Sequence, residues 1–165
     1  QKDNKSKLVG MKVTFHFVWE YAFLFDLYYD LCIVLIHFLL LSSQKLLLLF
    51  SLDAELFLPL RIVRIVGTSG VTVGEPCIGI GVSALFMSLI GASKSPVRNK
   101  VWFMTTGVLI IYVLNVLRIS ALAYLVQIDP YIWELNHKFL FTAIIYSVVF
   151  ILWRIWTKYF LKSNP

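Results

Sequence analysis

Residues 101–127, VWFMTTGVLIIYVLNVLRISALAYLVQ, decide the fold, because this apolar run contains one charged residue, Arg118. A helix over the run is long enough to cross the hydrocarbon core of a bilayer, which takes about 20 residues. Two further apolar runs flank it, at Pro76–Ala92 and Lys138–Trp156. Of the 165 residues in the chain, 59% are hydrophobic, whereas roughly half are apolar in ordinary soluble domains. The sequence therefore predicts an integral membrane protein.

The formal net charge of the chain is +6, and two groups of basic residues lie beside these apolar runs. Their position suggests that they set the orientation of the chain in the membrane. Short loops rich in Lys and Arg stay on the cytoplasmic side of a membrane. We therefore do not expect nucleic acid as a partner, and we expect the chain to pass outward along Val101–Gln127. The segment before Cys77 and the loop IDPYIWELNH, residues 128–137, are then outside. The two groups are Lys94, Arg98 and Lys100, and Arg154, Lys158 and Lys162.

The N-terminal third offers two candidates for one further crossing, VTFHFVWEYAFLFDLYY at 13–29 and LCIVLIHFLLLSSQKLLLLF at 31–50. We expect one of them to span and the other to lie at the outer interface. After them, RIVRIV and VTV flank the turn GTSG at 67–70, which predicts a short β-hairpin on the outer side. The predicted fold is an all-α integral membrane bundle of about four transmembrane helices with an interfacial helix and this hairpin. It forms a single domain over residues 1–165.

The first candidate reactive residue is Cys77, in the stretch GEPCIGIGVSALFMSLI at 74–90. Pro76 suits the first position of a helix, so we expect Cys77 in the first helical turn. The partial positive charge of a helix N-terminus favours the nucleophilic thiolate there. Glu75 is expected to be a helix N-terminal acid or to orient a basic partner, and Gly79 lets a neighbouring helix approach closely. The alternative is a cysteine that only fills space in the core.

Arg118 and His137 supply the other two candidate reactive groups. A guanidinium inside an apolar span costs at least about 2.5 kcal/mol on insertion scales, so such a residue usually has a function. Asn115, three residues earlier, shares its helical face. His137, preceded by Asn136, ends the outer loop. A thiolate, an imidazole and a fixed cation on one side of the membrane suit nucleophilic catalysis, although a structural Arg and a solvated His are alternatives.

Three motifs in this order, GEPCIGIGVSALF, NVLRI and NHKFLFTAIIYSVVF, resemble the exosortase/archaeosortase family, in particular its compact bacterial single-domain members. The resemblance covers roughly Arg61 to Tyr159. It implies a multi-pass cysteine peptidase or transpeptidase of the bacterial cytoplasmic (inner) membrane, with its active site on the outer side. Its substrates are exported proteins with a hydrophobic C-terminal sorting tail. It also implies Cys77 as nucleophile, His137 as base and Arg118 as the cation that stabilises the oxyanion or orients the substrate.

The chain departs from many family members at Ile78, directly after the cysteine, and at Phe141, four residues after the histidine. Both departures bear on which tail motif is accepted.

Other functional classes fit the residues less well. A metal site built from Cys77, His137 and Glu75 or Glu134 lacks the spacing and the four protein ligands usual for structural zinc, so we expect no metal. The proposed chemistry needs no cofactor. A small transporter subunit usually has repeated broken helices, and this chain has no repeat. A non-catalytic membrane assembly protein would use its small residues for helix packing alone. These two remain the alternatives to a peptidase.

Overall fold

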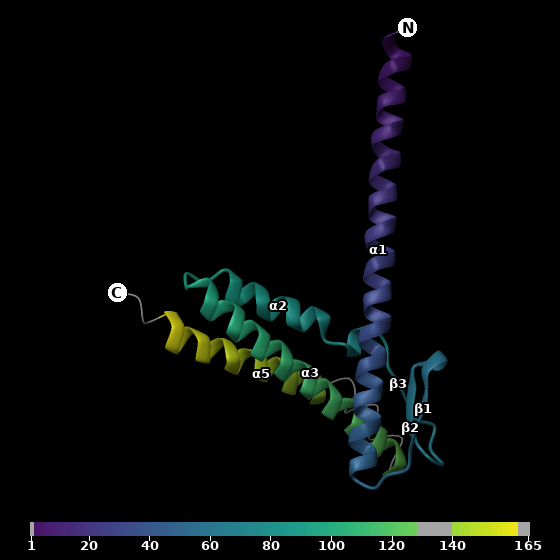
Figure 1. The fold of residues 1–165 in the computed structure, drawn as a ribbon, viewed down its shortest axis with the longest axis vertical. Coiled ribbons are helices and arrows are strands. Elements are labelled where there is room, and N and C mark those ends of the chain that lie inside the picture. The colour runs from purple at the N-terminus through teal and green to yellow at the C-terminus, as the bar shows by residue number, and fades with distance from the viewer. Residues whose placement is uncertain (1, 129–139, 162–165) are drawn as a thin grey trace. The chain divides into compact units, whose positions relative to one another are not determined.

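The computed structural model describes the backbone of residues 2–128 and 140–161 and the side chains of residues 25–128 and 140–160. The chain divides into two compact units, residues 1–35 and 36–165. Helix α1, Lys2–Leu49, is continuous, as Figure 1 shows. The candidate membrane span Phe25–Leu49 covers most of the second N-terminal candidate, residues 31–50, and the place of the first candidate at the outer interface stays a prediction. The helix contains no proline, so nothing in its backbone forces a break.

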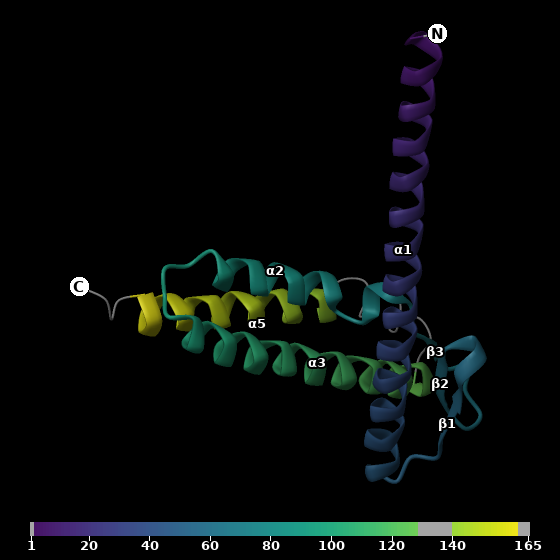
Figure 2. The ribbon, with the colours of Figure 1, turned by 45° about the horizontal axis from the view of Figure 1, so that its top comes forward.

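Three helices follow in residues 36–165: α2 at Ile80–Gly91, α3 at Val97–Ile128 and α5 at Phe141–Trp156. Helix α5 continues as the π-helical turn η4, Thr157–Leu161. The three lie side by side in both views of the ribbon (Figures 1 and 2). The mainly helical fold agrees with the prediction.

Three helical segments in the described part of the chain are long and apolar enough to cross a membrane: Phe25–Leu49, Val97–Ile128 and Phe141–Phe160. Helix α2 has 12 residues, which gives a length of about 18 Å, short of the hydrocarbon thickness of about 30 Å. The predicted span at Pro76–Ala92 is thus replaced by a shorter helix, and four crossings are not confirmed.

The core of this helical group lies where α2, α3 and α5 meet. Phe86, Ile90, Ile111, Val149 and Trp156 form one cluster of buried side chains. Because Gly107 of α3 has no Cβ, the ring of Phe86 can lie directly against its backbone, in space that a Cβ would occupy. This close approach sets how tightly α2 packs on α3.

Aromatic contacts hold the end of α5 to α3, and one hydrogen bond holds it to the loop between α2 and α3. The rings of Trp156 and Phe160 stack with their centroids 4.7 Å apart, and Phe103 lies 5.0 Å from Trp156. The indole Nε1–H of Trp156 donates to Ser93 Oγ at 3.0 Å. Trp156 is fully buried, so this acceptor satisfies a polar group that water does not reach.

Ser93→Ala is therefore expected to lower the free energy of unfolding by about 1–3 kcal/mol, because the buried indole N–H loses its acceptor. The measurement is unfolding in mixed micelles with increasing dodecyl sulfate. Ser88→Ala is the matched control, since Ser88 Oγ is exposed and only donates to Ala84 O of its own helix. Its effect should stay within about 0.5 kcal/mol. Equal effects of the two substitutions would contradict a role for the Ser93–Trp156 bond.

A three-stranded antiparallel sheet connects α1 to α2, with strands in the order β1 (Ala54–Phe57), β2 (Ile62–Ile65) and β3 (Val71–Thr72). The short 3₁₀ turn η1, Leu58–Leu60, joins β1 to β2. The predicted hairpin is present as β2 and β3, paired Ile62 to Thr72 and Val63 to Val71. Strand β1 was not predicted, since Ala-Glu-Leu-Phe has little of the β-branched character typical of strands.

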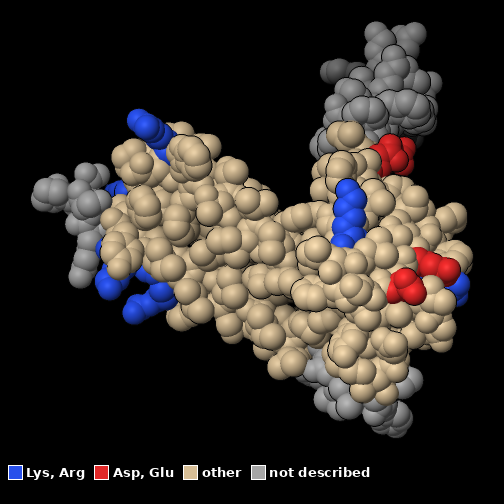
Figure 3. Space-filling view, turned by 60° about the horizontal axis from the view of Figure 1, so that its bottom comes forward, with Lys and Arg blue, Asp and Glu red and all other residues tan. Residues whose placement is uncertain are grey.

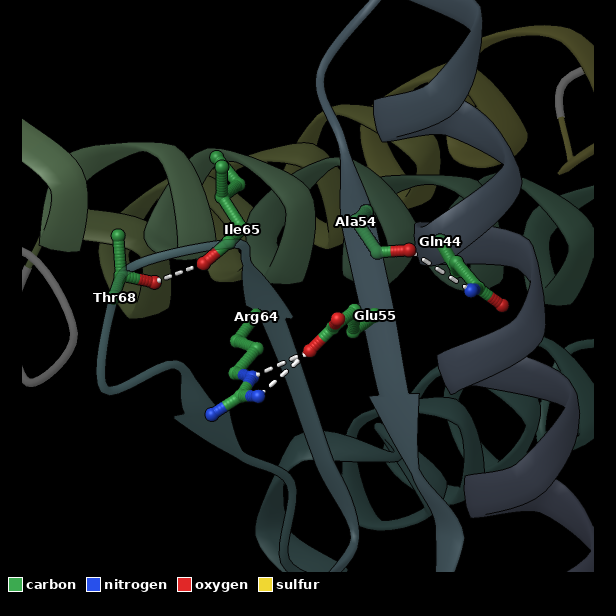
Figure 4. Close-up of polar contacts among 6 residues, drawn as sticks. All are labelled: Gln44, Ala54, Glu55, Arg64, Ile65 and Thr68. Carbon is green, nitrogen blue, oxygen red and sulfur yellow. Dashed lines mark hydrogen bonds and ion pairs between the residues drawn. The ribbon is translucent and has the colours of Figure 1, made fainter.

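The two faces of the sheet differ. Val63, Ile65 and Val71 are buried on one face. On the other face, Arg64 donates through Nε and Nη2 to Oε2 of Glu55, at 2.9 and 2.7 Å (Figure 4). The sheet therefore covers the core with one side and presents charged groups on the other.

Candidate functional site

Cys77 ends a single 3₁₀ turn, η2, which covers Glu75–Cys77. Its backbone N–H donates to Gly74 O at 3.0 Å, and that of Ile78 donates to Glu75 O at 3.2 Å. Pro76 is the second residue of this turn. Helix α2 starts three residues after Cys77, at Ile80, so the expectation that Cys77 lies in the first turn of that helix is wrong.

Gly79 is the physical reason for the interruption. It adopts the left-handed conformation, with φ of 78°, and forms the N-cap of α2. Its carbonyl accepts the first helical hydrogen bond, from Ser83 N at 2.9 Å. A residue without a side chain adopts this conformation at little cost, so the chain turns here instead of continuing from η2 into α2.

The side chain of Cys77 is 8% exposed, whereas those of Glu75 and Pro76 are exposed. The turn is tied to the sheet just before it, since Val73 N donates to Arg61 O at 2.8 Å. Cys32 and Cys77 are both free thiols. Cys77 is therefore a buried free thiol in a turn whose other two residues, Glu75 and Pro76, are exposed.

Gly79 also fixes the Cys77 turn to α3. A Cβ at Gly79 would lie 2.5 Å from Asn115 Nδ2 and 3.4 Å from Ile111 Cγ2, so the carboxamide of Asn115 rests on the glycine backbone. Asn115 is 1% exposed, and its Nδ2 donates to Ile111 O at 2.9 Å. The contact joins two of the motifs singled out in the sequence, GEPCIG and NVLRI.

Arg118 and Asn115 lie on the buried face of α3, as their spacing of three residues predicts. Arg118 is 9% exposed, while Val113 and Leu117 on the opposite face are 48% and 47% exposed. Among the described residues, Asn115 Oδ1 is buried and has no hydrogen-bond partner. The buried face of α3 thus contains a cation and an amide oxygen that is available for a hydrogen bond.

His137 and Asn136 lie outside the described residues, as does Glu134. The meeting of the imidazole with Cys77 and Arg118 stays a prediction. Glu75 is described, and its exposed side chain belongs to the η2 turn.

Several polar residues that the sequence analysis did not single out connect α1 to α3 and the sheet. Ser43 is fully buried and its Oγ donates to Leu39 O at 2.8 Å, while Ser120 Oγ donates to Ser43 O at 3.3 Å. Gln44 Nε2 donates to Ala54 O at 3.0 Å (Figure 4). In the sequence, these contacts are indicated by the stretch SSQ at 42–44, where small and polar residues interrupt an apolar run. Such residues are typical of close contacts between helices in membranes.

The described residues include no cluster of three or more His, Cys, Asp or Glu side chains arranged to hold a metal ion. The chemistry that these residues offer is that of a buried thiol, a buried cation and a buried amide on adjoining elements. No protein-family model, curated protein or solved structure matches the chain.

Proposed function

We propose that this chain is a membrane-embedded cysteine peptidase or transpeptidase, which cleaves the C-terminal sorting tails of exported proteins at the outer face of the bacterial inner membrane. The observation that carries the proposal is the packing of Gly79 against Asn115. It joins the turn that contains the only cysteine of residues 36–165 to the helix that contains the buried Arg118.

The antiparallel packing of α2 on α3 supports the same arrangement. Phe86 lies against Gly107, and Gly79, seven residues earlier, lies against Asn115, eight residues later. Cys77 comes two residues before Gly79 and Arg118 three residues after Asn115, so both residues lie close in sequence to this contact. We infer that the thiol and the guanidinium act on the same peptide bond.

In the proposed reaction, the Cys77 thiolate attacks the carbonyl carbon of the scissile peptide bond and forms a C–S bond. The developing oxyanion is stabilised by Arg118. His137 takes the thiol proton and returns it to the nitrogen of the leaving tail as the C–N bond breaks. The resulting thioester is then resolved by water, which gives hydrolysis, or by an acceptor amine, which gives transfer. In either case the thiol is regenerated.

A cleft next to this region suits the apolar part of a tail. It has a volume of about 470 Å³ and lies between the C-terminal end of α1 and the turns of α3 around Arg118. We assign it to apolar side chains of the substrate helix, since lipid-facing helices pack well against small residues such as Ser120 and Ala121. Its lining consists of Leu46, Leu47, Phe50, Leu52, Leu117, Ser120, Ala121 and Tyr124.

The test is coexpression of the chain with a tagged exported protein that ends in a hydrophobic helix and a basic cluster, encoded beside it. We expect the wild-type chain to shorten the tagged protein and the double variant Cys77→Ser, His137→Gln to leave it at full length. Immunoblotting measures the two forms. Equal shortening by the double variant would mean that another protease makes the cut, and it would favour the non-catalytic assembly protein, which needs neither side chain. Solute flux in liposomes without any shortening would favour the transporter subunit.

A further inference from the structure

Cations gather at one end of the α2, α3 and α5 group. Lys94 and Lys100 flank the start of α3, and Lys100 Nζ donates to Gly91 O at 2.9 Å. The bond from Trp156 to Ser93 brings the end of α5, with Arg154 and Lys158, to the same place. Figure 3 shows Lys and Arg side chains together at this end. The end is therefore a concentrated positive patch.

No carboxylate from these helices offsets the patch. Residues 80–128 and 140–161, which cover α2, α3, α5, η4 and the loop after α2, contain no Asp or Glu. The five acidic residues whose side chains the structure describes belong to α1, to the loop after it, to the sheet and to η2. Anionic groups are therefore the natural partners of this end.

A pocket of about 420 Å³ opens within the patch, along one face of the first turns of α3. Arg98 and Asn99 line it near the start of α3, Trp102 and Phe103 line it one turn further along the helix, and Phe160 of η4 also lines it. Thr106 also lines it, but its hydroxyl already donates to Trp102 O at 3.0 Å. The pocket is thus cationic at the helix end and aromatic toward the membrane span.

We infer that this pocket binds the headgroup of an anionic phospholipid. Arg98 and Asn99 donate to the phosphate, and a guanidinium matches its oxygens in a bidentate manner. The Trp102 side chain, which is 71% exposed, lies where an interfacial aromatic residue contacts the glycerol and the first acyl carbons. The basic pockets that bind anionic lipid headgroups in membrane proteins lie beside the ends of their helices in the same way.

Topology alone requires only that the loop be positively charged, and any of its cations satisfies that requirement. A binding site requires the cation that lines the pocket. Arg98 lines the pocket, whereas Lys94 is exposed in the adjoining loop and does not. Arg98→Gln and Lys94→Gln remove the same charge from the same end, so they separate the two explanations.

The experiment uses the full chain in detergent micelles, titrated with phosphatidylglycerol or with phosphatidylcholine of the same acyl chains, and counts bound lipids by native mass spectrometry. We expect the wild type to bind phosphatidylglycerol about fivefold more tightly than phosphatidylcholine, with Arg98→Gln losing this preference. Lys94→Gln should keep it within about twofold. Because Arg98 is exposed, Arg98→Gln should be as stable as the wild type. In micelles with phosphatidylcholine, both should unfold at the same concentration of dodecyl sulfate.

Two results would overturn the inference. An equal loss of preference in both variants, or no preference in the wild type, would reduce the patch to diffuse charge. Displacement of phosphatidylglycerol by an equal concentration of glycerol 3-phosphate would make the pocket a site for a soluble phosphate. Neither result bears on tail cleavage, so the inference is tested independently of the proposed function.

Discussion

Cys77→Ala is expected to reduce cleavage of a sorting tail by about a thousandfold or more, because the substitution removes the atom that forms the covalent bond with the substrate. The chain has one other cysteine, Cys32, in α1. The measurement is the rate at which the shortened tagged protein accumulates after coexpression is induced. The expected result is a rate indistinguishable from that of cells without the chain.

Cys32→Ala is the matched control, since it removes the other free thiol and leaves the sequence of the Cys77 turn unchanged. Its cleavage rate should stay within about twofold of wild type, as expected for a substitution away from the reacting atoms. The amount of each variant in the membrane must be equal, because lost protein would imitate lost activity. Unimpaired cleavage by Cys77→Ala at equal amount would eliminate the thiol as nucleophile.

Gly79→Ala is expected to produce the largest change in stability, a loss of about 2–5 kcal/mol in the free energy of unfolding. Two costs combine in this estimate. The left-handed backbone costs a residue with a Cβ about 1–2 kcal/mol, and the new carbon would lie 2.5 Å from Asn115 Nδ2. Overpacking of this kind costs about 1–3 kcal/mol. The measurement is again unfolding by dodecyl sulfate in mixed micelles.

Gly81→Ala provides a control of opposite sign. Gly81 lies within α2, and a Cβ there meets no described atom within 4 Å. Alanine is favoured over glycine inside a helix, so this variant should be unchanged or more stable by up to about 1 kcal/mol. Adding Asn115→Ala to Gly79→Ala should recover the packing part of the loss and leave the backbone part. Equal effects of the two glycine substitutions would show that the Gly79–Asn115 contact does not hold α2 on α3.

Parts of the candidate site could be predicted because local spacing alone determines them. Asn115 and Arg118 are three residues apart in one apolar helix, which places both on one face whatever that helix packs against, and both are buried. The same holds for the hairpin of β2 and β3, where β-branched residues alternate around a glycine-containing turn. The roles of Cys77, Arg118 and His137 in catalysis rest on their residue types and on the family resemblance, and stay predictions.

The sequence by itself determined that this chain is a mainly helical protein of the membrane, because long apolar runs with charges at their ends have no other favourable solvent. Only the tertiary structure decided that Cys77 precedes α2, that Phe86 lies on Gly107, and that Gln44 binds the carbonyl of Ala54. The last two are contacts between different elements of the fold, and the first accompanies the packing of Gly79 against Asn115. Whether a glycine precedes a helix, as Gly79 does, or forms a packing surface, as Gly107 does, depends on the side chain that packs against it. The hydropathy of the sequence does not identify that side chain.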